Sequence, residues 1–180
     1  MSTLLFTVSR CLVDTDEARH WTRQQVLREL AMLELGSCVI TGRSGFGDKT
    51  AEELAVAAKF MFRGYDLDGM TYDGAGRSVV EWTLQAPPKR HASAAQWKAW
   101  CLERNRVMVD NLRVTHFNMT EQLPDGTRVR SPRFDCRVVG IKAPWSKTDG
   151  TGFTVAEAQR VNLPNVMHVC PVEFAPRGKQ

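Results

Sequence analysis

Short runs of apolar and β-branched residues recur along this chain and alternate with longer segments in which apolar residues have helical spacing. The runs cover residues 4–8, 37–41, 78–84, 137–141 and 166–169. A strand with one solvated face alternates polar and apolar residues, whereas a strand covered on both faces is apolar throughout. The nearly continuous runs therefore predict five buried strands. Their alternation with helices predicts an α/β fold with a doubly wound, mostly parallel sheet and helices on both faces.

The segments between the runs carry signals for helix starts. Three of them open with a hydroxyl or carboxylate residue followed three positions later by Glu or Gln, which is the pattern of a capping box. These pairs are Asp14 with Glu17, Thr50 with Glu53, and Ser93 with Gln96. A fourth, short helix is expected over residues 154–161, because Asn162 and Pro164 then stop it.

Two segments interrupt this alternation. Residues 64–77 are rich in Gly and Asp, which predicts a loop with a tight turn. Residues 116–134 contain the turn sequence PDG between short polar–apolar runs, which predicts a β-hairpin inserted at about 115–135. No linker or repeat divides the 180 residues, so one domain over residues 1–180 is expected.

The composition excludes several classes of protein. Hydrophobic residues make up 43% and charged residues 24% of the chain, values typical of a globular protein rather than a disordered one. No apolar run approaches the roughly 18–20 residues of a membrane helix, and residues 4–8 are interpreted as a buried strand rather than part of a signal peptide. The five cysteines form no CxxC pair and the four histidines share no metal spacing. A cytoplasmic protein without metal or cofactor is expected.

Glycine-rich turns follow two of the predicted strands and lead directly into helices. They are GRSGFGDK at residues 42–49 and DGTG at residues 149–152. Parallel strands end at one edge of their sheet, where ligands of α/β proteins bind. Glycines let a phosphate approach the backbone, and the N–H groups at a helix start bind its charge. One such turn can be purely structural, but two at one edge favour an anionic ligand.

Four segments of the chain together resemble the SLOG superfamily, the Rossmann-like group that includes lonely-guy (lysine-decarboxylase-like) and DprA/Smf proteins. The resemblance is greatest to the small YspA-like branch. The segments are Ser9-Arg10 at the end of the first strand, GRSGFGDKTAEELA at 42–55, ERNRVMVD at 103–110, and GTGFTV at 150–155 followed by Ala158 and NLP at 162–164. The resemblance covers most of residues 4–169. It implies a Rossmann-like domain that pairs as a homodimer and binds a nucleotide-like or phosphoribose-bearing ligand.

The residues expected to bind this ligand are motif positions and their neighbours in the same loops. The motif positions are Ser9, Arg10, Gly42, Arg43, Ser44, Gly45, Arg104, Asn105, Gly150 and Thr151, and the neighbours are Asp48, Lys49, Pro144, Trp145 and Thr154. Arg10 and Arg104 would neutralise a phosphate, with Arg43 and Lys49 at the rim. Two of the residues have an ordinary alternative: Arg104 as a helix-surface arginine, and Trp145 as a core residue rather than a ring that stacks on a base.

The hydrolytic activity of the lonely-guy branch is not expected. The resemblance places Thr154 where those phosphoribohydrolases carry a catalytic glutamate. Cleavage of an N-glycosidic bond develops positive charge on the ribose, which a carboxylate stabilises and a threonine does not. Asp48, Asp149 or Glu157 would have to substitute in a rearranged loop.

The sequence leaves three functions open. The first is capture of a nucleotide or nucleotide-derived signal by a sensor or sequestering protein. The second is a nucleoside 5′-monophosphate phosphoribohydrolase. The third is a DprA-like nucleic-acid-binding protein, which the net charge of +4 permits and a basic cluster favours. That cluster comprises Arg128, Arg130, Arg133, Arg137 and Lys142, and its ordinary alternative is a solvated surface.

Overall fold

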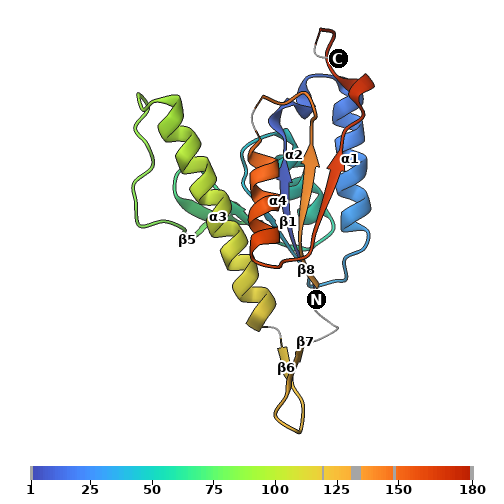
Figure 1. Ribbon diagram of the computed structural model, residues 1–180, viewed down its shortest axis with the longest axis vertical. Helices are drawn as coiled ribbons and strands as arrows, with labels where there is room; N and C mark the ends of the chain where they lie inside the picture. Colours follow the sequence, from blue (N-terminus) through green and yellow to red (C-terminus); the bar gives the residue numbers. More distant parts are fainter. Residues whose placement is uncertain (1, 119, 131–134, 148, 179–180) are drawn as a thin grey trace.

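The computed structural model describes residues 2–118, 120–130, 135–147 and 149–178. In these ranges the chain forms a seven-stranded sheet with helices on both faces (Figure 1). Its strands, in spatial order, are β5 (Ser78–Glu81), β4 (Met70–Asp73), β3 (Met61–Tyr65), β2 (Cys38–Thr41), β1 (Ser2–Val8), β8 (Asp135–Lys142) and β9 (Asn165–Val169). The fold class is therefore α/β, as predicted.

Five neighbouring strands, β3-β2-β1-β8-β9, are mutually parallel. The chain adds β2 and β3 on one side of β1, and then returns past β1 to add β8 and β9 on the other. The direction of strand addition therefore reverses between β1 and β8. In open parallel sheets this switch point leaves a crevice outside the carboxyl ends of the strands.

Helices α1 (Asp16–Leu30) and α2 (Phe46–Ala57) cover one face of the sheet, and α3 (Ala94–Asn118) and α4 (Gly150–Arg160) cover the other (Figure 1). Successive side chains of a strand point to opposite faces. Leu4 and Phe6 of β1 accordingly pack in the core beneath α1 and α2, while Leu5 packs in the core beneath α3 and α4. All three are fully buried, which explains the continuous apolar run. Short 3-10 helices η1 (Arg10–Val13) and η2 (Val172–Phe174) complete the chain.

The sheet has seven strands rather than the predicted five, and its third parallel strand is a different segment. Residues 78–84 were predicted as a buried parallel strand, but β5 is antiparallel and all four of its residues are exposed at the sheet edge. The parallel strand is β3, which alternates exposed Met61 and Arg63 with buried Phe62 and Gly64. β3 escaped prediction because only one of its faces is well covered. The expected loop at 64–77 instead contains β4.

The observed start differs from the predicted one in three of the four predicted helices. Ser93 and Gln96 do form the predicted box, since Gln96 N donates to Ser93 Oγ at 3.2 Å and Ser93 N donates to Gln96 Oε1 at 2.8 Å. Helix α1 is capped by Thr15 rather than Asp14. Helices α2 and α4 each begin about one turn before the predicted residue, because their glycine-rich turns already have helical geometry.

Strands β6 (Thr120–Gln122) and β7 (Arg128–Arg130) form the predicted antiparallel hairpin. It projects past the end of the sheet at which β1 and β8 begin, far from their carboxyl ends (Figure 1). Arg133 lies outside the described residues. In the part of the chain that the structure describes, no helix combines the length and apolar character needed to cross a membrane.

Candidate functional site

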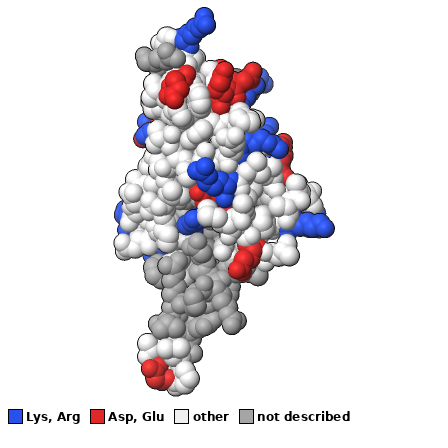
Figure 2. Space-filling model, turned by 90° about the vertical axis from the view of Figure 1, so that its right-hand side faces the viewer, with Lys and Arg blue, Asp and Glu red and all other residues white. Residues whose placement is uncertain are grey.

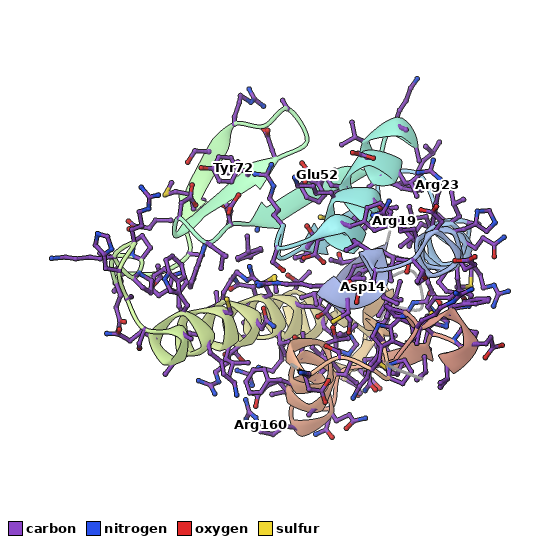
Figure 3. All side chains as sticks on the ribbon, turned by 90° about the horizontal axis from the view of Figure 1, so that it is seen from above. Asp14, Arg19, Arg23, Glu52, Tyr72 and Arg160 are labelled. Atoms are coloured by element: carbon purple, nitrogen blue, oxygen red, sulfur yellow. The ribbon has the colours of Figure 1, made fainter. Side chains whose placement is uncertain are left out.

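A cavity of about 630 Å³ opens at the carboxyl ends of β1 and β2, beside the switch point of the sheet. Figure 3 looks onto this end of the molecule. The lining comes from the end of β1 and Arg10, the turn after β2, one face of α3, and the start of α4. Its predicted members are Ser9, Arg10, Gly42, Ser44, Asp48, Arg104, Asn105, Gly150 and Thr151. The two glycine-rich turns thus meet at one cavity.

Arg104 of α3 lies beneath the turn that follows β2. Its residue is only 3% exposed, and its Nη1 donates to the Gly42 carbonyl at 2.6 Å. Its Nε and Nη2 donate to Oδ1 of Asn105 at 3.3 and 3.0 Å. A Cβ atom on residue 42 would lie 2.7 Å from Arg104 Nη2, which is closer than real contacts allow. Glycine at position 42 therefore makes room for the guanidinium, a structural role beyond the predicted approach of a phosphate.

Asn105 connects α3 to the start of α4. Its Nδ2 donates to Thr154 Oγ1 at 2.8 Å and lies 3.4 Å from the Gly150 carbonyl. Thr154 Oγ1 in turn donates to that carbonyl at 2.8 Å. Thr154 is fully buried and does not line the cavity, so it braces the first turn of α4 from behind. The N-cap of α4 is Asp149, whose side chain accepts from the Gly152 amide at 3.0 Å.

Asp48 places a buried carboxyl group in the lining. Its Oδ2 accepts from the amide and the hydroxyl of Ser44, both at 2.9 Å, and the residue is 3% exposed. Among the described residues, its Oδ1 has no hydrogen-bond partner. Burial raises the pKa of Asp48, and the Ser44 hydrogen bonds and the positive charge of Arg104 oppose that rise. Burial likewise lowers the pKa of Arg104, against the opposite pull of Asp48.

The start of α4 offers hydrogen-bond donors to the cavity. Gly150 and Thr151 both line it, and no acceptor for their backbone amides lies within the described residues. Ser9 and Thr151 add hydroxyl groups that lie 3.4 Å apart. Asp149 also lines the cavity, and Lys142, whose Nζ lies 2.9 Å from its carboxylate, lowers the pKa of that group. First-turn amides and their helix dipole favour an anion at this place.

Arg10 is exposed at the rim of the cavity. Its Nη2 lies 3.9 Å from the Cys101 sulfur on α3, and its own loop continues from β1. Unlike Arg104, it has no carbonyl or carboxylate partner among the described residues. Arg10 and Lys98 are thus the exposed positive residues of the described lining, and Arg10 is the one that directly follows β1.

Six predicted residues lie outside the cavity lining: Arg43, Gly45, Lys49, Pro144, Trp145 and Thr154. Arg43 turns away to Glu52 at 3.2 Å and Asp66 at 3.5 Å, and its guanidinium lies 4.8 Å from the centre of the Tyr72 ring. Figure 3 labels Glu52 and Tyr72, two of the residues that Arg43 contacts.

The other outlying residues have structural positions of their own. Lys49 is exposed on the same side as Arg43, and Gly45 supports the Arg10 side chain, whose Cγ lies 3.5 Å from the position of an added Cβ. Pro144 is exposed. Trp145 packs partly buried against the core beneath α1 and α2, which is the core role that the sequence left open for it.

The sequence interpretation missed the helical wall of the cavity. Its members on α3 include Ala94, Trp97, Lys98, Cys101, Leu102 and Met108, and Phe153 joins from α4. Met108 is also part of the core beneath α3 and α4, and Trp97 packs against that core. A signal for this wall was present in the sequence. Arg104 lies seven residues, or about two turns, from Trp97, so the two side chains share one face of the helix. A helix face that carries both apolar residues and a predicted ligand-binding arginine can border a cavity.

The basic cluster proposed for nucleic acid does not gather at the cavity. Arg137 pairs with Glu29 at 2.9 Å, and Lys142 pairs with Asp149. The side chains of Arg128 and Arg130 lie outside the description, and their hairpin is at the opposite end of the sheet (Figure 1). Figure 2 shows the face that bears α1 and β9, where positive and negative side chains are interspersed.

Comparison with known proteins yields no relative for this chain. No protein-family model, no curated protein and no solved structure matches it. The functional argument therefore depends on the cavity and on the motifs in the sequence.

Proposed function

We propose that the chain is a Rossmann-like, SLOG-type domain whose cavity binds a nucleotide or a nucleotide-derived ligand through its phosphate. The observation that carries this proposal is the meeting in one cavity of Arg10, Arg104 and the amides of Gly150 and Thr151, which have no acceptor among the described residues. Backbone amides at a helix start and charge-assisted contacts from arginine are the groups that proteins use for phosphate. The strand order around β1, with its reversal between β1 and β8, supports the Rossmann-like assignment.

Each phosphate-binding group has a distinct part in this proposal. The Gly150 and Thr151 amides, with the hydroxyls of Ser9 and Thr151, surround the phosphate oxygens. Arg10 approaches from the rim and supplies the mobile charge. Arg104 has five N–H donors, of which three are used by Gly42 and Asn105. Its remaining donors and its charge are available to the ligand, while its bonded donors fix the turn after β2.

Binding without hydrolysis fits the carboxylates of the site. Thr154 offers no charge and is fully buried. Asp149 caps α4 and pairs with Lys142. Glu157 pairs with Arg160 at 2.9 Å and does not line the cavity. Asp48 is the one acidic residue of the described lining without an ion pair within 4 Å, and it keeps the phosphoribohydrolase as the second candidate.

Thermal denaturation with a panel of phosphorylated nucleosides tests the proposal. The panel contains AMP, ADP-ribose, NAD and cyclic AMP, each also titrated by calorimetry. A ligand at 100 times its dissociation constant adds about 2.7 kcal/mol to the unfolding free energy, which gives a clear shift in Tm. At least one nucleotide should bind, and Arg10→Ala should weaken it about tenfold because a charge-assisted contact is lost.

Lys49→Ala is the matched control for Arg10→Ala. Lys49 is an exposed basic residue close in sequence to the cavity but outside its lining, so its loss should leave the affinity unchanged. Equal losses in the two variants would mean that general surface charge, rather than this cavity, attracts the nucleotide. A steep fall of DNA or RNA binding with salt, in the absence of any nucleotide binding, would favour the nucleic-acid function instead.

A further inference from the structure

The cavity has two chemically different ends. The strand ends and α4 supply the polar end described above, whereas α3 supplies an apolar wall. The apolar members of the wall are Ala94, Trp97, Cys101, Leu102 and Met108, to which the lining adds Phe153 of α4 and the exposed Lys98 of α3. A volume of about 630 Å³ falls within the range of sites that enclose a whole small molecule, about 300–1,000 Å³. A phosphate alone would leave this wall in contact with water.

The wall and the phosphate-binding end lie on the same face of α3. The lining residues of this helix recur every three or four positions, at 94, 97–98, 101–102, 104–105 and 108. Trp97 and Arg104 are seven residues apart, which is two turns, or about 10 Å along the helix axis. A ligand that contacts both must therefore be elongated, with its anionic group and its apolar group at opposite ends.

Trp97 is held in position by the tertiary structure around it. It is half-buried and packs against the core cluster that contains Trp82 and Trp100. The rings of these two tryptophans lie 4.9 Å apart, and their Nε1 atoms donate to the carbonyls of Asp66 and Leu67 at 2.8 and 3.0 Å. The first turns of α3 are thereby anchored to the loop between β3 and β4. The indole of Trp97 faces the cavity from a rigid support.

We propose that Trp97, together with Phe153, binds the heteroaromatic base of the nucleotide whose phosphate occupies the polar end. This inference rests on the proposed function and adds the part of the ligand that the apolar wall selects. Flat aromatic side chains bind nucleobases by stacking, and an amphipathic cavity of this length matches the order phosphate, sugar, base. An alkyl phosphate, which has no ring, would gain less from the two aromatic side chains.

Calorimetric titration with three probes tests this assignment. The probes are AMP, ribose 5-phosphate and hexyl phosphate, which carry a base, no base and an alkyl chain on the same anionic group. The wild-type protein should bind AMP at least about tenfold more tightly than either other probe, since stacking on one aromatic side chain commonly changes affinity by a factor of about 5 to 100. Trp97→Leu should weaken AMP about tenfold and leave ribose 5-phosphate unchanged, while Trp97→Phe should keep most of the AMP affinity.

Trp145→Leu is the matched control, because Trp145 is also half-buried but packs on the opposite face of the sheet. It should leave the affinities for all three probes unchanged. Equal binding of AMP and ribose 5-phosphate to the wild-type protein, or equal binding of AMP and hexyl phosphate, would overturn the base assignment and leave the phosphate site standing. Failure of all nucleotides and all three probes to bind would overturn the proposed function itself. The comparison of the three probes on the wild-type protein tests the base assignment even if Trp97→Leu does not fold.

Discussion

Arg104 and Asn105, consecutive residues of α3, tie the two glycine-rich turns to one another. Arg104 Nη1 donates to the Gly42 carbonyl at 2.6 Å, and Asn105 Nδ2 lies 3.4 Å from the Gly150 carbonyl. The two side chains are also joined, because Asn105 Oδ1 accepts from Arg104 Nη2 at 3.0 Å. A single helix thus sets the distance between the turns, and with it the shape of the candidate phosphate site.

Asn105→Ala should lower the free energy of unfolding by about 1–3 kcal/mol. The substitution leaves the buried guanidinium of Arg104 and the hydroxyl of Thr154 without a shared partner, and an unsatisfied buried polar group costs about that much. Urea denaturation measures the change. Arg113→Ala is the control: this exposed residue of α3 pairs with Asp110 on the surface of the same helix, so its loss should change the stability by no more than about 0.5 kcal/mol. Similar losses in both variants would contradict the linking role of Asn105.

Gly42→Ala should destabilise the protein by about 1–3 kcal/mol and weaken nucleotide binding. The added methyl group would lie 2.7 Å from Arg104 Nη2, so the guanidinium must move and lose its bond to the Gly42 carbonyl. Denaturation and calorimetry report the two effects. Gly150→Ala is the matched substitution in the other turn, where the nearest atom, Asn105 Nδ2, lies at an ordinary 4.0 Å. Its stability should stay close to that of the wild type, and equal destabilisation would refute the steric explanation.

Asp48→Asn should become more stable relative to the wild type as the pH rises above about 3.8. Burial raises the pKa of Asp48 in the folded protein above its ordinary value of 3.8. A raised folded pKa means that the folded state holds the proton more tightly, so its contribution to stability is full below about pH 3.8 and is lost as the pH rises through the folded pKa. The asparagine variant has no proton to lose. Its unfolding free energy should therefore gain on that of the wild type as the pH rises from about 3.8 through the raised folded pKa of Asp48.

Urea titrations at several pH values measure this difference. Asp16→Asn is the control, because the Asp16 side chain is 96% exposed, and its profile should parallel that of the wild type. An Asp48→Asn profile that runs parallel to the wild type would show that the carboxyl group is not strained by burial. The variant should also bind a phosphate more tightly, since it removes a negative charge from the lining.

The wild-type protein should release no adenine from AMP, and Thr154→Glu should not create that activity. Thr154 is fully buried and exchanges hydrogen bonds with Asn105 and the Gly150 carbonyl. A glutamate there would bury an unpaired charge behind the lining, which should cost at least about 3 kcal/mol of stability. Chromatography of the reaction mixture and a denaturation curve test both statements. Adenine release that disappears in Asp48→Asn would instead assign hydrolysis to Asp48.

Part of the site could be predicted from the sequence because the strands of a parallel sheet have recognisable apolar runs and a regular arrangement. The runs at 4–8, 37–41, 137–141 and 166–169 became β1, β2, β8 and β9. Parallel strands end at the same edge, so the turns after β2 and β8 had to open on one side of the molecule. Nine of the predicted residues line the cavity there.

Other parts of the fold and site depend on contacts between distant residues. The position of Arg43 in the turn predicted that it would lie at the rim of the cavity. Its guanidinium instead pairs with Glu52 and Asp66, outside the cavity lining. Residues 61–65 lack a continuous apolar run because β3 has an exposed side, while the apolar residues Val79 and Val80 lie exposed at the sheet edge. The composition of a segment shows how apolar it is, but the elements that pack against it determine which of its faces is buried.

The sequence by itself determined four of the five parallel strands, the helices between them and the edge at which the glycine-rich turns meet. These features follow from the spacing of apolar residues and from the geometry of parallel strands, which are local or repetitive properties. Only the tertiary structure decided that the Trp97 face of α3 borders a cavity as well as the core. That outcome depends on the Trp82–Trp100 contact, which anchors the first half of α3 to the β3–β4 loop and joins residues 18 positions apart in the chain. Helical spacing is the same for a buried stripe and for a cavity wall, so the difference exists only once the partners of the helix are in place.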